Sequence, residues 1–203
     1  MIVDDSSPDG TAEVGRRLSG VYQGRIQVIQ RTGKQGLGTA YLVGFDQALQ
    51  DGVGYIVQMD ADLSHAPEEV PRLLHLLRRY DVAVGSRYVD GGGVDADWST
   101  RRRLLSYLAN LGIRGIAGLG VRDATSGFKA YRASVIRSLA QGGFRCKGFG
   151  FQTEVAHACQ RMGCEVAEHP ILFVDRARGR SKMSVNIALE ALWQLAFLRL
   201  RRT

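Results

Sequence analysis

The chain has 203 residues, a length that suits a single domain with a sizeable core. Its 27 basic and 20 acidic residues give a formal net charge of +7, which favours an anionic partner such as a phosphorylated small molecule, a membrane surface or a nucleic acid. Three cysteines without a CxxC pair argue against a disulfide framework or a zinc site, and no apolar run reaches the length of about 20 residues that spans a bilayer.

The first half of the chain alternates between short apolar strands and amphipathic helices. We predict strands at residues 1–3, 25–30, 55–59 and 81–85. We predict helices at residues 11–18, 39–49 and 67–77, the first of them capped by Asp9 or Thr11. This order favours a mostly parallel sheet flanked by helices, in which ligands lie beyond the carboxyl ends of the strands.

The second half is less regular. It predicts a helix at residues 101–117, a loop that leads into a strand at 123–132, a helix at 149–162 and an edge strand at 165–170. A basic loop follows at 176–182. Residues 184–203 then have helical character with one polar stripe, so this segment either lies at a membrane interface or packs on its own domain. We therefore divide the chain into a domain at 1–183 and a C-terminal amphipathic helix at 184–203.

Two carboxylates follow the strand at 55–59, at Asp60 and Asp62, with Ala61 between them. Such a pair at a strand end can hold a hard divalent cation, which prefers oxygen ligands and would recruit a diphosphate. Acidic residues also follow strands simply as turn formers. The presence of Asp5 and Arg87 at other predicted strand ends favours the metal–diphosphate interpretation. Ser64 either adds an oxygen ligand or serves the turn, and we read His65 as a turn or supporting residue.

Six motifs then occur in one order along the chain. They are VDDSSPDGT (3–11), RTGKQGLGTAY (31–41), MDADLSHAPEE (59–69), GSRYVDGG (85–92), DATSGFKAYR (123–132) and RGRSKMS (178–184). Together they resemble the polyprenol-phosphate mannosyltransferases, the dolichol-phosphate mannose synthase group of glycosyltransferase family 2. The resemblance covers nearly the whole chain.

The resemblance implies a GT-A fold, which is a Rossmann-like nucleotide-sugar-binding fold, and an inverting transfer of mannose from GDP-mannose to a polyprenyl phosphate. It also implies a divalent metal, Mg²⁺ or Mn²⁺, and a peripheral position on the cytoplasmic face of the cell membrane, with a membrane-anchoring partner or domain left open. Positions that match the family suggest nucleotide contacts at Val3 and Asp5, and metal and diphosphate contacts at Asp60, Ala61 and Asp62. They suggest contacts to the diphosphate and mannose at Arg87, Arg176 and Lys182. Contacts to the acceptor phosphate are suggested at Arg87, Arg102 and Ser106. Among these, Asp62, Arg87 and Arg102 are the predicted catalytic residues.

Two departures from the family pattern stand out. Many relatives have Gln at the position of Ser64, so we expect water to replace a third protein ligand there. Relatives also begin with a strand and a proline-tyrosine-asparagine-glutamate turn that helps to bind the base. We therefore expect an N-terminal truncation that removes the first strand of the sheet.

The acceptor is a phosphate monoester that is largely dianionic at neutral pH, so we predict no catalytic base and assign catalysis to positioning and charge stabilisation. Three alternatives stay open: a polyprenyl-phosphate glucosyltransferase or an enzyme for another sugar nucleotide, an inactive truncated remnant, and a nucleic-acid-binding domain. The basic residues lie beside acidic turns and no nucleic-acid recognition motif is present, so we expect no nucleic-acid partner.

Overall fold

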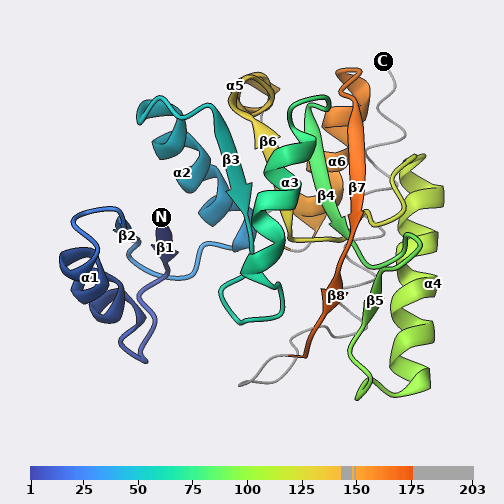
Figure 1. Cartoon of the computed structure of the whole chain (residues 1–203), viewed down its shortest axis with the longest axis horizontal. Coiled ribbons are helices and arrows are strands. Elements are labelled where there is room, and N and C mark those ends of the chain that lie inside the picture. The colour runs from blue at the N-terminus through green and yellow to red at the C-terminus, as the bar shows by residue number, and fades with distance from the viewer. Residues whose placement is uncertain (143–147, 149, 176–203) are drawn as a thin grey trace.

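The computed structural model of the chain describes residues 1–142, 148 and 150–175 (Figure 1). Its helices are α1 (Thr11–Val21), α2 (Leu37–Gln50), the short 3₁₀ helix η1 (Pro67–Glu69), α3 (Val70–Leu76), α4 (Thr100–Ala117), α5 (Ala133–Gly142) and α6 (Gly150–Arg161). Its strands are β1 (Ile2–Asp4), β2 (Val28–Gln30), β3 (Tyr55–Gln58), β4 (Val82–Ser86), β5 (Gly93–Val94), β6 (Lys129–Arg132), β7 (Val166–Pro170) and β8 (Leu172–Phe173).

The central sheet has four strands in the order β3-β6-β4-β7. Strand β4 runs parallel to β7, whereas β6 runs antiparallel to both β3 and β4. Strands β3, β4 and β7 therefore point the same way, and β6 is inserted between them in the opposite direction. The predicted α/β class is confirmed, and the strand that departs from the expected parallel direction is β6.

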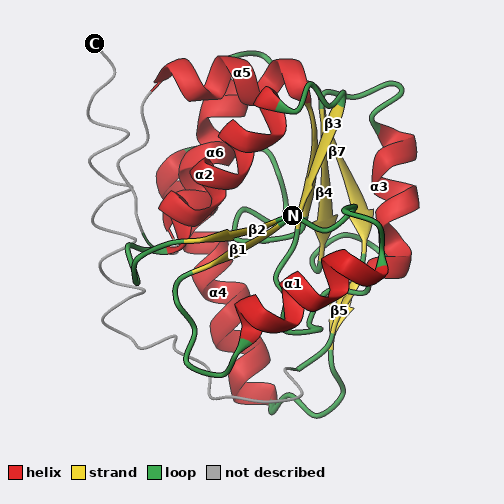
Figure 2. Ribbon diagram, turned by 90° about the vertical axis from the view of Figure 1, so that its left-hand side faces the viewer, coloured by secondary structure: helices red, strands yellow, loops and turns green. Residues whose placement is uncertain are grey.

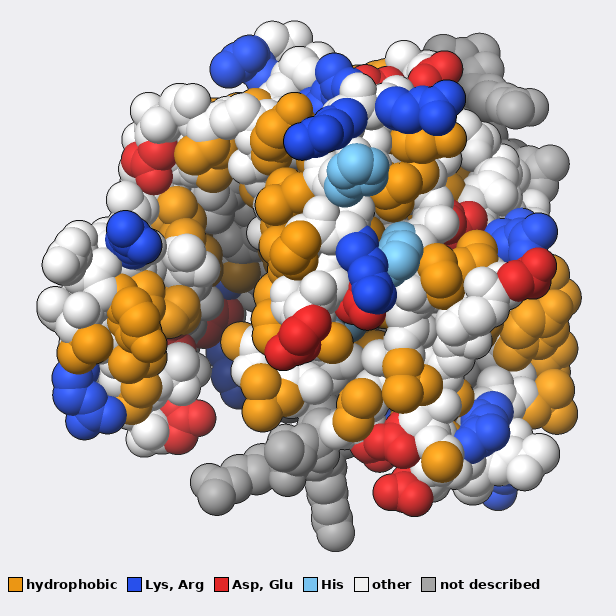
Figure 3. Space-filling model, viewed as in Figure 1, with side chains coloured by type: hydrophobic (Ala, Val, Ile, Leu, Met, Phe, Trp, Pro, Cys, Tyr) orange, Lys and Arg blue, Asp and Glu red, His pale blue; other side chains and the backbone are white. Residues whose placement is uncertain are grey.

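Two small parallel pairs lie beside this sheet. Strand β1 pairs with β2, and β5 pairs with β8. Within the described residues no strand joins the β1–β2 pair to the central sheet. Figure 2 shows β1 and β2 lying across the direction of the central strands, and Figure 3 shows a hollow between this N-terminal unit and the rest of the molecule. The expected loss of a first strand stays a prediction.

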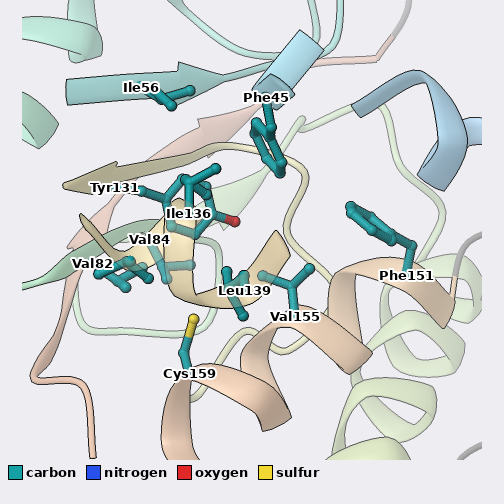
Figure 4. Packing of buried hydrophobic residues seen from close by; sticks show 11 residues of the cluster. Phe45, Ile56, Val82, Val84, Tyr131, Ile136, Leu139, Phe151, Val155 and Cys159 are labelled. Carbon is teal, nitrogen blue, oxygen red and sulfur yellow. The ribbon is translucent and has the colours of Figure 1, made fainter. Parts of the chain in front are cut away.

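Helices cover both faces of the central sheet, with α3 on one face and α2, α5 and α6 on the other (Figure 2). The side chains alternate accordingly, because successive residues of a strand point to opposite faces. On the α2–α5–α6 face, Tyr131 of β6 packs edge-on against Phe45, in a buried cluster that also contains Phe151 (Figure 4). On the α3 face, Ala130 packs near Leu73. Both layers are buried, so the sheet is held rigidly from two sides.

Most of the predicted elements are present, with ends that differ by a few residues. The cap of α1 differs, because Gly10 occupies the N-cap position with a left-handed φ of 78° while the Asp9 carboxylate accepts from the Thr11 amide. The sequence did not predict α5, β5 or β8. The helix expected at 184–203, and with it the domain boundary, lies outside the described residues. In the part of the chain that the structure describes, no helix is both long and apolar enough to cross a bilayer.

Candidate functional site

Charged residues from three segments meet at one edge of the central sheet. Asp60 and Asp62 follow β3, and Arg87 follows β4. Because β6 is antiparallel, the residues that precede it also reach this edge, and Asp123 is among them. The antiparallel strand thus places an acidic residue beside the carboxyl ends of its neighbours.

The Asp60 carboxylate accepts a hydrogen bond from Tyr41 and has room because residue 127 is glycine. The Tyr41 hydroxyl of α2 donates to Asp60 Oδ1 over 2.9 Å. Gly127 lies behind the carboxylate, where a Cβ would come within 3.3 Å of both oxygens. Burial raises the pKa of the Tyr41 phenol, and the negative charge of Asp60 raises it further, so the hydroxyl remains a donor. The Asp60 oxygens are therefore held in one orientation.

The Asp62 carboxylate is held by its own turn. The Ser64 amide donates to Asp62 Oδ1 over 3.1 Å, and the Ser64 hydroxyl donates to the same oxygen over 2.5 Å. Ser64 is fully buried, and its carbonyl accepts from the Val174 amide. This geometry is that of a turn residue which orients Asp62, and a role for Ser64 as a third metal ligand stays a prediction.

The donor set suits a hard cation that is shared with a substrate. The described residues contain no group of three or more His, Cys, Asp or Glu side chains that could hold a metal by themselves. Mg²⁺ and related ions are, however, commonly bound by one or two carboxylates while substrate phosphates and water complete the coordination. Asp60 and Asp62, each oriented by a hydroxyl donor, fit that mode of binding.

His65 lies under the two aspartates and is not exposed as a ligand. Its Nδ1 accepts from the Asp60 amide over 3.2 Å, and its ring stacks on Phe128. Burial lowers the pKa of the His65 imidazole, against the opposing effect of the Asp60 carboxylate. His65 therefore supports the turn, as expected from the sequence, and its lowered pKa favours the neutral form.

Arg87 forms a buried ion pair with Asp123. Its Nε and Nη2 each donate to one carboxylate oxygen over 2.8 Å, and Nη2 also donates to Thr125 Oγ1 over 2.6 Å. Burial alone would lower the pKa of Arg87, but the Asp123 carboxylate holds it above its usual range. Burial alone would likewise raise the pKa of Asp123, but Arg87 keeps it below its usual range. The guanidinium is thus permanently charged and rigidly held.

A buried polar network lies beneath these groups. Gln58 donates to the Gly127 carbonyl over 3.1 Å and to Gln152 Oε1 over 2.8 Å. The Lys129 ammonium donates to the carbonyl and the side-chain oxygen of Gln152. Burial lowers the pKa of Lys129 to about 8. This network ties the start of α6 to the segment that supports Asp60.

A second part of the site lies along the first two turns of α4. The Arg102 guanidinium donates to both oxygens of Asp175, over 2.7 and 3.2 Å, and lies 3.7 Å from the centroid of the Trp98 ring. The Ser106 hydroxyl shares a 2.8 Å hydrogen bond with the Tyr88 hydroxyl. The Arg102 guanidinium therefore makes a bidentate hydrogen bond to a carboxylate, a geometry in which it can also bind a phosphate.

Aromatic side chains join the two parts. The centroid of the Phe173 ring, on β8, lies 5.4 Å from the centroid of the His65 ring and 6.0 Å from that of the Trp98 ring. The Arg87 guanidinium lies over Phe173 at 5.4 Å and over Tyr88 at 5.1 Å. The aspartates after β3, the arginine after β4 and the start of α4 thus form one continuous wall.

The remaining predicted residues are placed differently. Val3 belongs to β1, and the carboxylate of Asp5, just after that strand, pairs with Arg31. Arg31 is buried and also donates to Thr39 Oγ1, so it ties Asp5 to the start of α2. Arg176 and Lys182 lie outside the described residues.

Sequence reasoning assigned no role to several residues that shape the site. They are Arg31, Tyr41, Tyr88, Trp98, Asp123, Phe173 and Asp175. Four of them lie within the motifs quoted above, namely Arg31, Tyr41, Tyr88 and Asp123. Their place in these motifs was the only sign in the sequence that they belong to the site. Their roles depend on partners that are distant in the chain.

Comparison with known proteins settles the family. The pattern of Glycosyl transferase family 2 matches residues 1–140, which is more than half of the chain. The chain belongs to this family. The predicted glycosyltransferase class is therefore confirmed. A protein of Micrococcus luteus named undecaprenyl-phosphate mannosyltransferase is 41% identical over 201 residues, covering 97% of this chain and 82% of that protein. Polyprenol monophosphomannose synthase of Mycolicibacterium smegmatis is 43% identical over 197 residues, covering 97% of this chain and 74% of that protein.

Solved structures of glucosyl-3-phosphoglycerate synthase from Mycobacterium tuberculosis share the fold. One complex with phosphoglyceric acid has a TM-score of 0.65 at 17% identity, over 97% of this chain and 68% of that one. A complex of the same synthase with Mn²⁺ and UDP-glucose also has a TM-score of 0.65 at 17% identity, over 98% of this chain and 66% of that one. The predicted GT-A fold is thereby confirmed.

Proposed function

We propose that this chain transfers mannose from GDP-mannose to a polyprenyl monophosphate, with inversion at the anomeric carbon. The observation that carries this proposal is the similarity to two mannosyltransferases named for lipid-phosphate acceptors, over 97% of the chain. The arrangement of Arg87, Arg102 and Ser106 along one wall supports it, because these groups suit a phosphate.

On the donor side, Asp60 and Asp62 would hold a divalent cation, Mg²⁺ or Mn²⁺, which would supply positive charge to the departing diphosphate. The fixed orientation of both carboxylates supports this role. The nucleotide contacts Val3, Asp5 and Ala61. Positive charge around the diphosphate and mannose comes in addition from Arg176 and Lys182. These assignments rest on the family resemblance.

On the acceptor side, Arg102 and Ser106 bind the phosphate through hydrogen bonds, and the positive charge of Arg87 stabilises it. The Arg102 guanidinium releases the Asp175 carboxylate and binds the acceptor phosphate in its place. The half-exposed position of the Arg102–Asp175 ion pair supports this exchange. The phosphate monoester has a second pKa of about 6, so it arrives as a dianion and attacks without a protein base. The chain's contribution is the alignment of two anionic reactants and the neutralisation of their charge.

We place this reaction at the cytoplasmic face of the cell membrane, with the chain bound peripherally. The lipid acceptor lies in the membrane, whereas the sugar nucleotide is a water-soluble molecule. A bilayer surface is therefore where the two substrates meet.

A donor panel tests the proposal. The purified chain is incubated with undecaprenyl phosphate, Mg²⁺ and, in separate reactions, radiolabelled GDP-mannose, UDP-glucose or UDP-galactose, and lipid-extractable label is counted. We expect label from GDP-mannose, and a β-linked product from an α-linked donor. Label from UDP-glucose instead would replace the proposed donor, and no label from any donor would contradict transfer by this polypeptide.

A Tyr41→Phe variant tests the support of Asp60. The phenyl ring keeps its stacking on Phe151, but the hydrogen bond to Asp60 Oδ1 is lost. A hydrogen bond to a charged group contributes about 1.5–3 kcal/mol, so we expect the metal concentration for half-maximal transfer to rise about tenfold. The control is Tyr55→Phe, whose side chain is half exposed on β3. An unchanged metal requirement in Tyr41→Phe would show that Tyr41 does not position Asp60.

A further inference from the structure

Lys129 of β6 is a buried cation. It is 2% exposed, and its ammonium donates to two oxygens of one residue, the Gln152 carbonyl over 3.0 Å and Gln152 Oε1 over 3.1 Å. None of the ion pairs within the described residues includes Lys129. A buried lysine without an ion pair is rare, because removing its charge from water is costly. The cost points to a role for the ammonium that an apolar side chain could not fill.

The ammonium holds both the backbone and the side chain of Gln152, the third residue of α6. Gln152 Oε1 accepts a second hydrogen bond from Gln58 Nε2, over 2.8 Å. Gln152 Nε2 is buried and has no hydrogen-bond partner among the described residues. Two donors thus meet the amide oxygen, and they hold the amide in one orientation.

Hydrogen bonds lead from Gln152 to the backbone beside Asp60. The Gln58 amide that donates to Gln152 also donates to the Gly127 carbonyl over 3.1 Å. Gly127 is the residue that leaves room for the Asp60 carboxylate, since a Cβ there would lie 3.3 Å from its oxygens. Gln58 itself ends β3, two positions before Asp60. Gln152 therefore supports both neighbours of this carboxylate.

A second set of contacts leads from the start of α6 to the same carboxylate. Phe151 directly precedes Gln152, and its ring stacks on that of Tyr41 with centroids 5.9 Å apart and planes at 6°. The Tyr41 hydroxyl is the donor to Asp60 Oδ1. Figure 4 shows Phe151 on α6 among the side chains of the buried cluster. By anchoring Gln152, Lys129 fixes the start of α6 and with it the ring that supports Tyr41.

We infer that Lys129 is a positioning residue for the Asp60 carboxylate and acts on it through Gln152. Without the ammonium, Gln152 and the start of α6 lose their anchor, and both sets of contacts with Asp60 weaken. Lys129 thus governs how tightly a cation is held rather than the chemical step. The inference rests on the cation site that the proposed function places at Asp60 and Asp62.

Nucleotide binding by the full chain tests the inference without any sugar transfer. GDP, and in a parallel series UDP, is titrated calorimetrically at rising Mn²⁺ concentrations. Lys129→Met keeps a side chain of similar length but removes the charge and its hydrogen bonds. We expect the Mn²⁺ concentration that gives half of the metal-dependent gain in affinity to rise about fivefold or more, because a charge-assisted support of Asp60 is lost. An unchanged Mn²⁺ requirement in the folded variant would overturn the inference.

Two substitutions of Gln152 test whether Lys129 acts through it, and they decide the matter if Lys129→Met does not fold. Gln152→Glu keeps an oxygen for both donors and gives up only the nitrogen that has no partner among the described residues, so its Mn²⁺ requirement should stay within about twofold of the wild type. Gln152→Leu removes the accepting oxygen and should raise the requirement as Lys129→Met does. Equal effects of Glu and Leu would overturn the inference.

The double variant Lys129→Met/Gln152→Leu completes the cycle. Because the two residues act as one unit, its Mn²⁺ requirement should not exceed that of the more affected single variant. Single effects that multiply in the double variant would mean that Lys129 and Gln152 act independently, which would overturn the inference.

Val135→Ala is the matched control for a loss of stability. Val135 of α5 is buried in the same core cluster as Phe151 but belongs to neither set of contacts with Asp60. Its truncation should lower the midpoint of urea denaturation and leave the Mn²⁺ requirement unchanged. An equal rise in Val135→Ala and Lys129→Met would mean that general destabilisation causes the effect, and would overturn the inference.

Sugar transfer separates this inference from the proposed function. In an active chain, Lys129→Met should need more Mn²⁺ for half-maximal transfer but reach a rate within about twofold of the wild type at saturating Mn²⁺. A lower saturating rate with an unchanged Mn²⁺ requirement would overturn the inference. Mn²⁺-dependent nucleotide binding that depends on Lys129, in a chain that transfers sugar from no donor, would support the inference and overturn the proposed function.

Discussion

An Asp62→Asn variant is expected to lose at least about 99% of sugar transfer, a loss of about 100-fold or more, while it keeps its fold. Asparagine retains an oxygen that can accept from the Ser64 amide and hydroxyl, so the turn after β3 should persist. What it lacks is the negative charge that holds a divalent cation. The loss should therefore fall on metal-dependent turnover rather than on folding.

The measurement is the initial rate of lipid-linked product at saturating Mg²⁺, with circular dichroism to monitor the fold. Asp90→Asn is the matched control, because Asp90 is a fully exposed aspartate that pairs only loosely with Arg122 at 3.7 Å. The control should transfer like the wild type. Near-normal transfer by Asp62→Asn would exclude Asp62 from the metal site.

An Asp123→Asn variant is expected to lose about 3–5 kcal/mol in the free energy of unfolding, because it leaves the Arg87 charge buried without its partner. Asp123 is fully buried and accepts from Nε, Nη2 and the backbone amide of Arg87. Urea denaturation near neutral pH measures the change. Asp46→Asn, at an exposed position of α2, is the control and should stay within about 0.5 kcal/mol of the wild type.

The same pair predicts a pH dependence. The pKa of Asp123 is lowered from 3.8 in the folded protein, so its contribution is complete above that value and is lost as the pH falls through the lower folded-state pKa. The difference between wild type and Asp123→Asn should therefore shrink when unfolding is measured at about pH 3 rather than about pH 7. A difference that is equally large at both values, or absent at neutral pH, would show that the ion pair does not supply this stability.

The sequence predicted the part of the site that depends on single strands and their ends. Asp60 and Asp62 follow β3 and Arg87 follows β4, as the alternation of apolar strands and helices indicated. The direction of β6 was not predictable in this way, because its pairing with β3 joins residues about 75 positions apart, such as Tyr55 and Arg132. Consequently the sequence could not predict that Asp123 lies against Arg87.

The second half of the site shows the same limit. The spacing of Arg102 and Ser106 placed both on one helix, and the structure confirms that helix. Their partners, Asp175 and Tyr88, come from segments 73 and 18 residues away. Phe173 joins the two parts because the two-residue strand β8 pairs with β5, and strands that short carry almost no periodic signal.

The most direct test of the metal–diphosphate site is the binding of GDP with and without Mn²⁺, measured by titration calorimetry on the wild type and on Asp62→Asn. We predict that Mn²⁺ strengthens GDP binding by at least about tenfold in the wild type, since a cation held by Asp60 and Asp62 would supply positive charge to the diphosphate. In Asp62→Asn the metal should have almost no effect. Binding of GDP by the wild type that is the same with and without Mn²⁺, or a metal effect that survives in Asp62→Asn, would contradict the assignment of these two aspartates.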